Sequence, residues 1–377
     1  MQQILFTGKK KVELVSREQE KPASNGNLIG GKTLFSLVSA GTELHYGYLN
    51  LQNNSFPITP GYAAVFEVDD AGDGVEGFRP GDLVFCCGNH RSYQLVEAEN
   101  AVRIPKGVTP EAALFSRMAG VSMATLSRTG VRPGGRVLVT GLGAVGILAM
   151  QAYYNCGYDV TGIEPDERRA EAARQVTGLP VWNKLEEPHC FHLALECSGT
   201  QQAVATCCAA LCDGGELSLV GVPWNRTGAV DSFSILNPIF YQYLKVYSGW
   251  EMNLPMNAGR FAPVSQCGNF RLALEWMRVG KMRTQGLYGV YPCIEAQAVY
   301  NAIFEKRRNM FLPSSIGGSA DDTQRNGNRS RAFPQLPRRG RRGAVPFYVE
   351  TGRKPVWYLF FSSRYAGAWC FHRRTSP

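Results

Sequence analysis

Three glycines at a fixed spacing are the residues of this chain most directly tied to chemistry. Gly141, Gly143 and Gly146 form the pattern G-x-G-x-x-G immediately after an apolar run at residues 137–139. Gly141 permits a tight turn, Gly143 leaves room for a pyrophosphate, and Gly146 lets a following helix pack closely on the strand. The first N–H groups of that helix would then face the phosphates. The pattern predicts a site for a nicotinamide dinucleotide.

An acidic residue stands where the adenosine ribose of such a dinucleotide is expected. Glu164 closes a second apolar run at residues 159–163 and lies 18 residues after Gly146. A carboxylate there accepts hydrogen bonds from free ribose hydroxyls and repels a 2′-phosphate. The sequence therefore predicts a preference for NAD(H). NADP(H) stays the open alternative, because Arg168 and Arg169 follow closely.

An alternation of strands and helices is needed to hold these residues. Apolar runs at residues 136–140, 159–163, 193–199 and 215–221 are separated by helical patterns, which favours a parallel sheet. The ends of the last two runs are expected to line the nicotinamide side of the site. The remaining expected cofactor contacts are Ala144, Val145, Ser198, Gly199, Val222 and Pro223.

The first hundred residues have a different pattern. Gly, Asn and Pro clusters separate short alternating segments, which indicates a compact β-rich domain. These predicted strands lie near residues 11–15, 34–38, 62–68 and 78–85. Helical patterns follow at residues 110–128, 270–279 and 294–307.

The excess of positive over negative charge lies in one segment of the chain. The net charge is +9, and residues 313–377 carry all of it, with eleven Arg and one Lys against three acidic residues. This segment is low in complexity and has no sustained periodicity, so we expect a disordered basic tail. Such a tail binds nucleic acid weakly, through phosphate contacts. Its removal is predicted to leave cofactor affinity unchanged.

The amino terminus and the cysteines predict a cytoplasmic protein. No long apolar stretch follows the first basic residues, so neither a signal peptide nor a membrane anchor is expected. The eleven cysteines are odd in number and include adjacent pairs, which indicates reduced thiols. No C-x-x-C pattern occurs, so a structural zinc lobe lacks its usual ligand spacing.

Several motifs in a fixed order resemble the medium-chain dehydrogenase/reductase superfamily over about residues 1–310. They are SAGTELH at residues 39–45, PGY at 60–62, FRPGDLV at 78–84, the glycine pattern, ECSG at 196–199 and GELSLVGVP at 215–223. The resemblance implies an α/β fold with a GroES-like β-rich catalytic domain and a doubly wound Rossmann domain. The catalytic domain is expected at residues 1–120, completed by about 271–312, and the Rossmann domain at 121–270.

The zinc ligands that this resemblance would imply are missing. Alcohol dehydrogenases of the superfamily place them where this chain has Ala40, Tyr62 and the pair Ser116-Arg117, none of which is a usual zinc ligand. In this respect the chain is similar to the branch that contains bacteriochlorophyllide a dehydrogenase. We therefore expect no catalytic zinc.

The resemblance also implies a route for protons. Thr42 and His45 match a relay from the substrate oxygen through the ribose to an imidazole, and Glu43 matches a supporting carboxylate. A hydroxyl can pass a proton, and a histidine can release it to water. Without zinc, a carbonyl oxygen needs another stabiliser, and Thr42, Tyr62 and His90 are the candidates.

These observations favour a cytosolic NAD(P)-dependent oxidoreductase. It would move a hydride between nicotinamide and a carbonyl, an alcohol or an activated alkene of a small-molecule substrate. No membrane partner is expected, and a homodimer is possible. A second hypothesis is a non-catalytic nucleotide sensor or RNA-binding protein that uses the basic tail. A third alternative is a metal site formed by Glu43, His90 and a cysteine of the pair Cys86-Cys87 in place of the missing zinc ligands.

Overall fold

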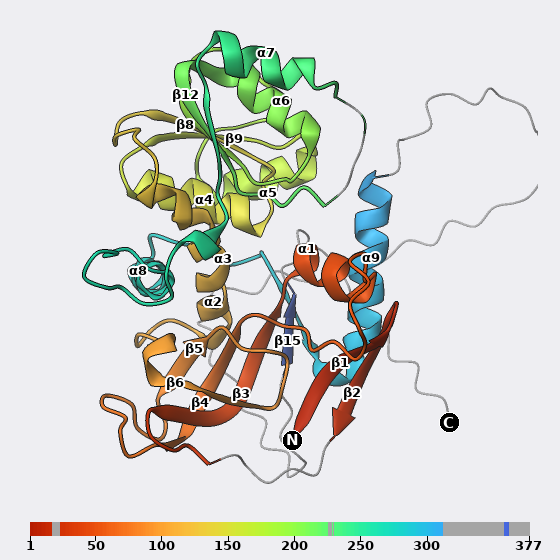
Figure 1. Cartoon of the computed structure of the whole chain (residues 1–377), viewed down its shortest axis with the longest axis vertical. Helices are drawn as coiled ribbons and strands as arrows, with labels where there is room; N and C mark the ends of the chain where they lie inside the picture. Colours follow the sequence, from red (N-terminus) through yellow and green to blue (C-terminus); the bar gives the residue numbers. More distant parts are fainter. Residues whose placement is uncertain (17–22, 225–227, 229, 312–357, 362–377) are drawn as a thin grey trace, which may run out of the picture.

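A computed structural model describes residues 1–16, 23–224, 228, 230–311 and 358–361. Within them the chain forms two bodies joined by helices, one built on a parallel sheet and the other on a mostly antiparallel sheet (Figure 1). The predicted α/β fold with a β-rich part and a Rossmann part is confirmed. No helix in this described part is long and apolar enough to cross a lipid bilayer.

The β-rich domain contains a seven-stranded sheet and a two-stranded ribbon. The sheet follows the order β14-β15-β3-β4-β5-β7, with β6 also paired to β3. Its strands and the ribbon strands are β1 (Gln2–Gly8), β2 (Lys11–Ser16), β3 (Leu28–Val38), β4 (Ala64–Ala71), β5 (Leu83–Cys86), β6 (Tyr93–Glu97), β7 (Ala101–Arg103), β14 (Gly289–Pro292) and β15 (Tyr358–Phe361). Its helical segments are α1 (Ala40–Glu43), η1 (Leu44–Tyr48), η2 (Ala98–Asn100), η5 (Cys293–Glu295) and α9 (Ala296–Phe311).

One strand of this sheet comes from the segment expected to be a disordered tail. Strand β15 pairs antiparallel with β14 and parallel with β3, and Leu359 is fully buried. The expectation of no regular element after Pro313 is therefore wrong for these four residues. A short apolar run gains order here because two neighbouring strands satisfy its backbone groups. Residues 312–357 and 362–377, which hold the basic clusters, lie outside the described residues.

The second body is a six-stranded parallel sheet in the order β10-β9-β8-β11-β12-β13. Its strands are β8 (Arg136–Thr140), β9 (Asp159–Ile163), β10 (Val181–Trp182), β11 (Phe191–Glu196), β12 (Leu211–Leu219) and β13 (Lys245–Ser248). Its helices are α4 (Ala144–Asn155), α5 (Glu167–Thr177), α6 (Gln201–Ala210), α7 (Phe233–Tyr241) and η4 (Glu251–Asn253). The strand order changes direction between β8 and β11, and ligands of such folds bind at the carboxyl ends of the strands beside that point.

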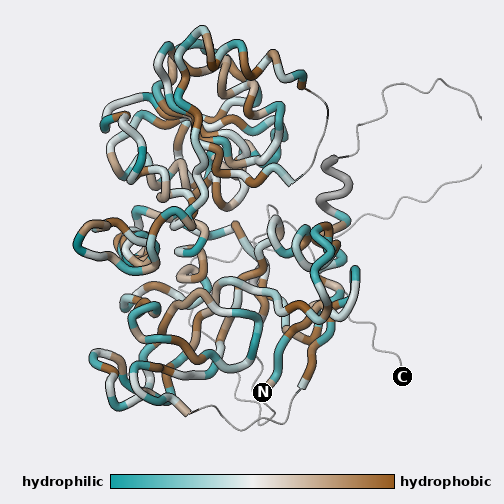
Figure 2. Tube along the Cα trace, viewed as in Figure 1, coloured by the Kyte–Doolittle hydropathy of each residue, from teal (hydrophilic) through white to brown (hydrophobic). Residues whose placement is uncertain are grey.

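Burial explains why the central strands carry apolar runs instead of alternating patterns. In β8, Val137, Leu138 and Val139 are all fully buried, because helices cover both faces of the sheet. Figure 2 shows hydrophobic stretches along the strands at the centre of the upper body. The continuous apolar runs of the Rossmann domain therefore follow from the coverage of its sheet on both faces.

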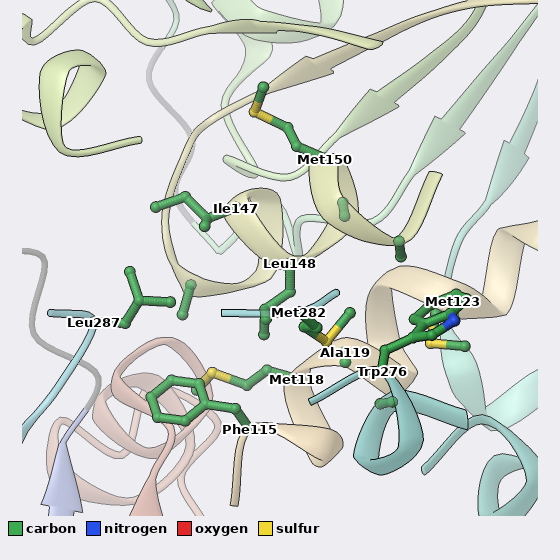
Figure 3. Close-up of a cluster of buried hydrophobic side chains, with 14 of the residues drawn as sticks. Phe115, Met118, Ala119, Met123, Ile147, Leu148, Met150, Trp276, Met282 and Leu287 are labelled. Carbon is green, nitrogen blue, oxygen red and sulfur yellow. The ribbon is translucent and has the colours of Figure 1, made fainter. Parts of the chain in front are cut away.

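Helices between the two sheets form a continuous apolar core. The helical connection comprises α2 (Pro110–Leu114), α3 (Ser116–Met123) and η3 (Ala124–Ser127), and α8 (Gln266–Arg278) packs beside it. In Figure 3, Met118 and Ala119 of α3 face Leu148 of α4. The Phe85 and Phe270 rings, 5.2 Å apart between centroids, connect β5 with α8. This packing sets the position of α3 between the two domains.

Candidate active site

Three loops meet at the carboxyl ends of the central parallel strands. Gly141, after β8, adopts a left-handed φ of 76°, and a Cβ there would lie 2.5 Å from Cβ of Ser198, after β11. Gly199 also has a left-handed φ, and a Cβ there would overlap the carbonyl oxygen of Val222, after β12. The structure thus brings together the predicted residues of three separate motifs at the switch point of the sheet.

The amino terminus of α4 fits a pyrophosphate. Gly143 is its N-cap, in an extended conformation, and has no side chain to cap the N–H groups of the first turn, which begins with Ala144 and Val145. A Cβ on Gly146 would overlap the carbonyl oxygen of Gly141. The third glycine therefore sets the shape of the loop, as the sequence pattern predicts.

Glu164 lies one residue after β9, at the same edge of the sheet. Its side chain is 1% exposed, accepts the Leu142 N–H at 3.1 Å and forms an ion pair with Arg169 of α5. Asp166 caps α5 by accepting the Arg169 N–H at 3.0 Å, which holds this turn in place. The expected ribose-binding carboxylate is thus fixed beside the glycine loop, and Arg169 offsets its charge.

Glu196 is a buried residue of this edge that sequence reasoning did not single out as functional. It is the last residue of β11, and its carboxylate accepts the N–H groups of Ser198 at 2.7 Å and Gly199 at 3.0 Å. Burial raises the pKa of Glu196, while the hydrogen bonds from Ser198 and Gly199 oppose that rise. Glu196 therefore shapes the turn that presents Ser198 and Gly199. Its sequence signals are its place at the start of the ECSG motif and at the end of a mostly apolar strand.

The two proposed relay residues lie on one short helical segment. Thr42 is exposed in α1, and His45 follows in η1, where its Nδ1 lies 2.8 Å from the Gly41 carbonyl oxygen. The His45 ring stacks on Trp224 at 5.0 Å between centroids. Trp224 follows β12, so this contact joins the β-rich domain to the edge of the Rossmann sheet that carries the glycine loop, here called the cofactor edge. Trp224 was not among the predicted site residues.

Glu43 and His90 form a buried hydrogen-bonded network. His90 is fully buried, with Nδ1 2.8 Å from Ser36 Oγ and Nε2 3.1 Å from Glu43 Oε2. Glu43 also accepts the Ser39 N–H at 2.8 Å and the Tyr300 hydroxyl. Both ring nitrogens of His90 are therefore engaged within the protein. This geometry favours a role for Glu43 and His90 in positioning α1, instead of contact between His90 and a substrate oxygen.

Tyr62 lies against a buried cation. The Arg117 guanidinium carbon is 4.8 Å from the centroid of the Tyr62 ring, and Arg117 Nη2 donates to Glu251 Oε1 at 2.7 Å. Burial raises the pKa of Tyr62, whereas Arg117 and a hydrogen bond with Ser39 lower it. Arg117 and Glu251 were not predicted as site residues. Their partnership spans 134 residues and leaves no local sequence signal.

The donor set around these residues does not fit a zinc ion. Ala40 has no ligand atom, and Arg117 places a positive charge beside Tyr62. Among the residues that the structure describes, no group of three or more His, Cys, Asp or Glu side chains is arranged to hold a metal. Burial further raises the pKa of the Cys86 thiol, which opposes metal binding as thiolate.

Comparison with known proteins agrees with this architecture. No protein-family model matches the sequence. L-threonine 3-dehydrogenase of Pyrococcus abyssi is 28% identical over 283 residues, which cover 62% of this chain and 78% of that protein. Galactitol-1-phosphate dehydrogenase of Escherichia coli superposes with a TM-score of 0.65 at 18% identity, over 83% of this chain and 98% of that one. A quinone oxidoreductase of Pseudomonas syringae gives a TM-score of 0.63 at 17% identity, over 81% and 97%.

The fold and the three-loop edge define a two-domain oxidoreductase with a dinucleotide-binding domain. In sequence and in fold the chain is similar to dehydrogenases of the medium-chain dehydrogenase/reductase superfamily. The resemblance predicted from the ordered motifs is confirmed at that level.

Proposed function

We propose that this protein catalyses hydride transfer between a nicotinamide cofactor and a carbonyl, alcohol or activated alkene of a small molecule. The observation that carries the proposal is the convergence of Gly141, Ser198 and Gly199 with the uncapped amino terminus of α4 at the switch point. A bound nicotinamide would supply or accept the hydride. Glu164, together with the glycine loop, would hold the adenosine half of the cofactor.

The chain's own residues would manage the proton that accompanies the hydride. Thr42 is exposed on α1 and is suited to contact a substrate oxygen, and His45 lies three residues further along the same segment. An imidazole can exchange a proton with water near neutral pH. The stacked Trp224 ring would hold His45 in one orientation while covering it on the Rossmann side.

Fluorescence titration followed by a turnover assay tests this function. We expect NADH to bind, and to be oxidised in the presence of at least one member of a panel of aldehydes, ketones and quinones. Failure of both NADH and NADPH to bind would contradict the proposal. Binding without turnover across the panel would favour the alternative of a nucleotide-sensing protein.

We also propose that hydride transfer proceeds here without catalytic zinc. In support, Ala40 and Tyr62 offer no ordinary zinc ligand. We expect dialysed protein to contain far less than one zinc per chain and to keep its activity in the presence of a chelator. Elemental analysis and the turnover assay check this. One tightly bound zinc whose removal abolishes activity and whose return restores it would contradict the prediction.

The position of Glu164 supports a preference for NADH over NADPH. A 2′-phosphate would meet a buried carboxylate, although Arg169 weakens that repulsion. We expect the ratio of NADH affinity to NADPH affinity to fall about tenfold in the Glu164→Gln variant, equivalent to about 1.4 kcal/mol. Glu167→Gln, which changes an exposed carboxylate paired with Arg174, is the matched control and should leave the ratio unchanged. Tighter binding of NADPH by the unaltered protein would overturn the assignment.

A further inference from the structure

Arg117 is a buried cation whose hydrogen-bonding capacity the protein only partly uses. The residue is 3% exposed, and its Nε and Nη1 atoms have no hydrogen-bond partner among the residues that the structure describes. Within that part of the chain, Nη2 alone is engaged, by Glu251 at 2.7 Å. Unsatisfied buried donors are costly, and those of a charged group are more costly than most. A buried donor left unpaired by the protein calls for an explanation, and an acceptor from outside the protein is one.

The location of Arg117 connects it with the proposed reaction. Glu251 follows β13 and therefore lies at the carboxyl edge of the parallel sheet, the edge that carries the glycine loop. Ser122, five residues after Arg117 in α3, donates to the Val145 carbonyl oxygen in the first turn of α4 at 2.8 Å. Five helical residues span roughly 7 Å. On its other side, Arg117 contacts Tyr62 of the β-rich domain. Arg117 thus lies between the β-rich domain and the edge of the parallel sheet that carries the glycine loop.

The charges around Arg117 select the kind of acceptor. Glu251 already neutralises the guanidinium, and both side chains are almost completely buried. A full carboxylate added here would leave a net negative charge in a buried site, which is costly. A neutral carbonyl oxygen adds no net charge, and gains a charge-assisted hydrogen bond as it becomes more negative during reduction.

We propose that Arg117 binds the carbonyl oxygen of the substrate and stabilises it during hydride transfer. The inference rests on the oxidoreductase function proposed above and names a neutral aldehyde or ketone as its substrate class. In reduction the carbonyl carbon receives the hydride, the π electron pair moves to the oxygen, and the oxygen takes a proton supplied from water through the Thr42–His45 relay. Arg117 keeps its own protons throughout.

A double substitution removes the donors without stranding a buried charge. In Arg117→Met combined with Glu251→Gln, we expect kcat/KM for carbonyl reduction to fall about 10²–10³-fold, while NADH affinity stays unchanged. Arg117→Lys should recover part of the loss, and added guanidinium ion should restore part of the activity of the double variant. A merely structural role for Arg117 would show no such rescue.

The matched control is Arg136→Met. Arg136 also pairs with carboxylates and lies over an aromatic ring, 4.8 Å from the centroid of Phe191, but it begins β8 at the opposite edge of the sheet. We expect this variant to keep both NADH affinity and kcat/KM. A loss equal to that of the double variant would show that removing any such arginine perturbs the protein.

Binding of unreactive ligands tests the site independently of turnover. Benzamide offers a neutral carbonyl oxygen and benzoate a full anion, and both can be titrated into the NADH complex by fluorescence. We expect the unaltered protein to bind benzamide more tightly than benzoate. In the double variant the affinity for benzamide should fall at least about tenfold, because a tenfold change in affinity corresponds to the loss of one good hydrogen bond.

The outcomes separate this inference from the proposed function. Failure of the unaltered protein to bind either NADH or NADPH would refute the function itself. If NADH binds, but neither turnover nor the affinity for benzamide changes when Arg117 is replaced, only the inference is refuted. NADH-bound protein that neither reduces any aldehyde or ketone nor binds benzamide would also refute the inference alone. Tighter, Arg117-dependent binding of benzoate would assign the site to an anion and overturn the choice of a neutral carbonyl.

Discussion

Gly146→Ala is expected to lower affinity for NADH by at least about tenfold, roughly 1.4 kcal/mol or more of binding free energy. The added Cβ would overlap the carbonyl oxygen of Gly141, so either the loop after β8 or the start of α4 must move. Both parts are needed to receive a pyrophosphate, because the loop must approach it closely while the helix directs N–H groups toward it. Fluorescence titration of NADH measures the loss.

Gly259→Ala is the control for this substitution. No heavy atom outside its immediate chain neighbours lies within 4 Å of a Cβ built at Gly259, so the same change meets no obstacle there. We expect that variant to bind NADH as the unaltered protein does. Equal affinity in the Gly146→Ala variant would show that the loop does not form the phosphate site.

Leu359→Ala is expected to destabilise the protein by about 2–5 kcal/mol, the usual cost of removing a fully buried leucine side chain. Leu359 lies in β15 between β14 and β3 and belongs to the core cluster that contains Val38, Leu44 and Tyr300. Urea unfolding measures the change. Val290→Ala, on the adjacent strand at a position 44% exposed, should change stability by less than about 0.5 kcal/mol.

The same strand changes the expected effect of deleting residues 313–377. Such a chain loses β15, which leaves the facing edges of β14 and β3 without their partner. We expect the deletion to destabilise the β-rich domain, whereas the sequence alone predicted a loosely attached tail whose removal leaves cofactor affinity unchanged. A shortened chain that unfolds at the same urea concentration as the full chain would show that β15 contributes nothing to the sheet.

The cofactor edge was predictable because its determinants are local. Gly141 and Gly146 act within one strand-turn-helix unit, and Glu164 directly follows the next strand. Backbone sterics and strand length alone place such residues together, whatever the rest of the chain does. The three-loop convergence then follows from parallel strands ending at the same edge. Glu196, at the end of β11, could have been found by the same reasoning, as a buried acidic residue at the end of a mostly apolar strand.

The environment of the reacting oxygen was decided only by tertiary structure. Glu43 meets Tyr300 across 257 residues and Arg117 meets Glu251 across 134. Stacking of His45 on Trp224 likewise depends on how the two domains pack. None of these pairs has a spacing that a sequence pattern can reveal, because burial and charge neutralisation arise from the packing of distant elements. The sequence thus determined the two-domain fold and the dinucleotide loop. Packing decided that His90 lies in a closed hydrogen-bonded network, that Arg117 is a buried donor, and that an apolar run beyond residue 350 completes a sheet begun near residue 30.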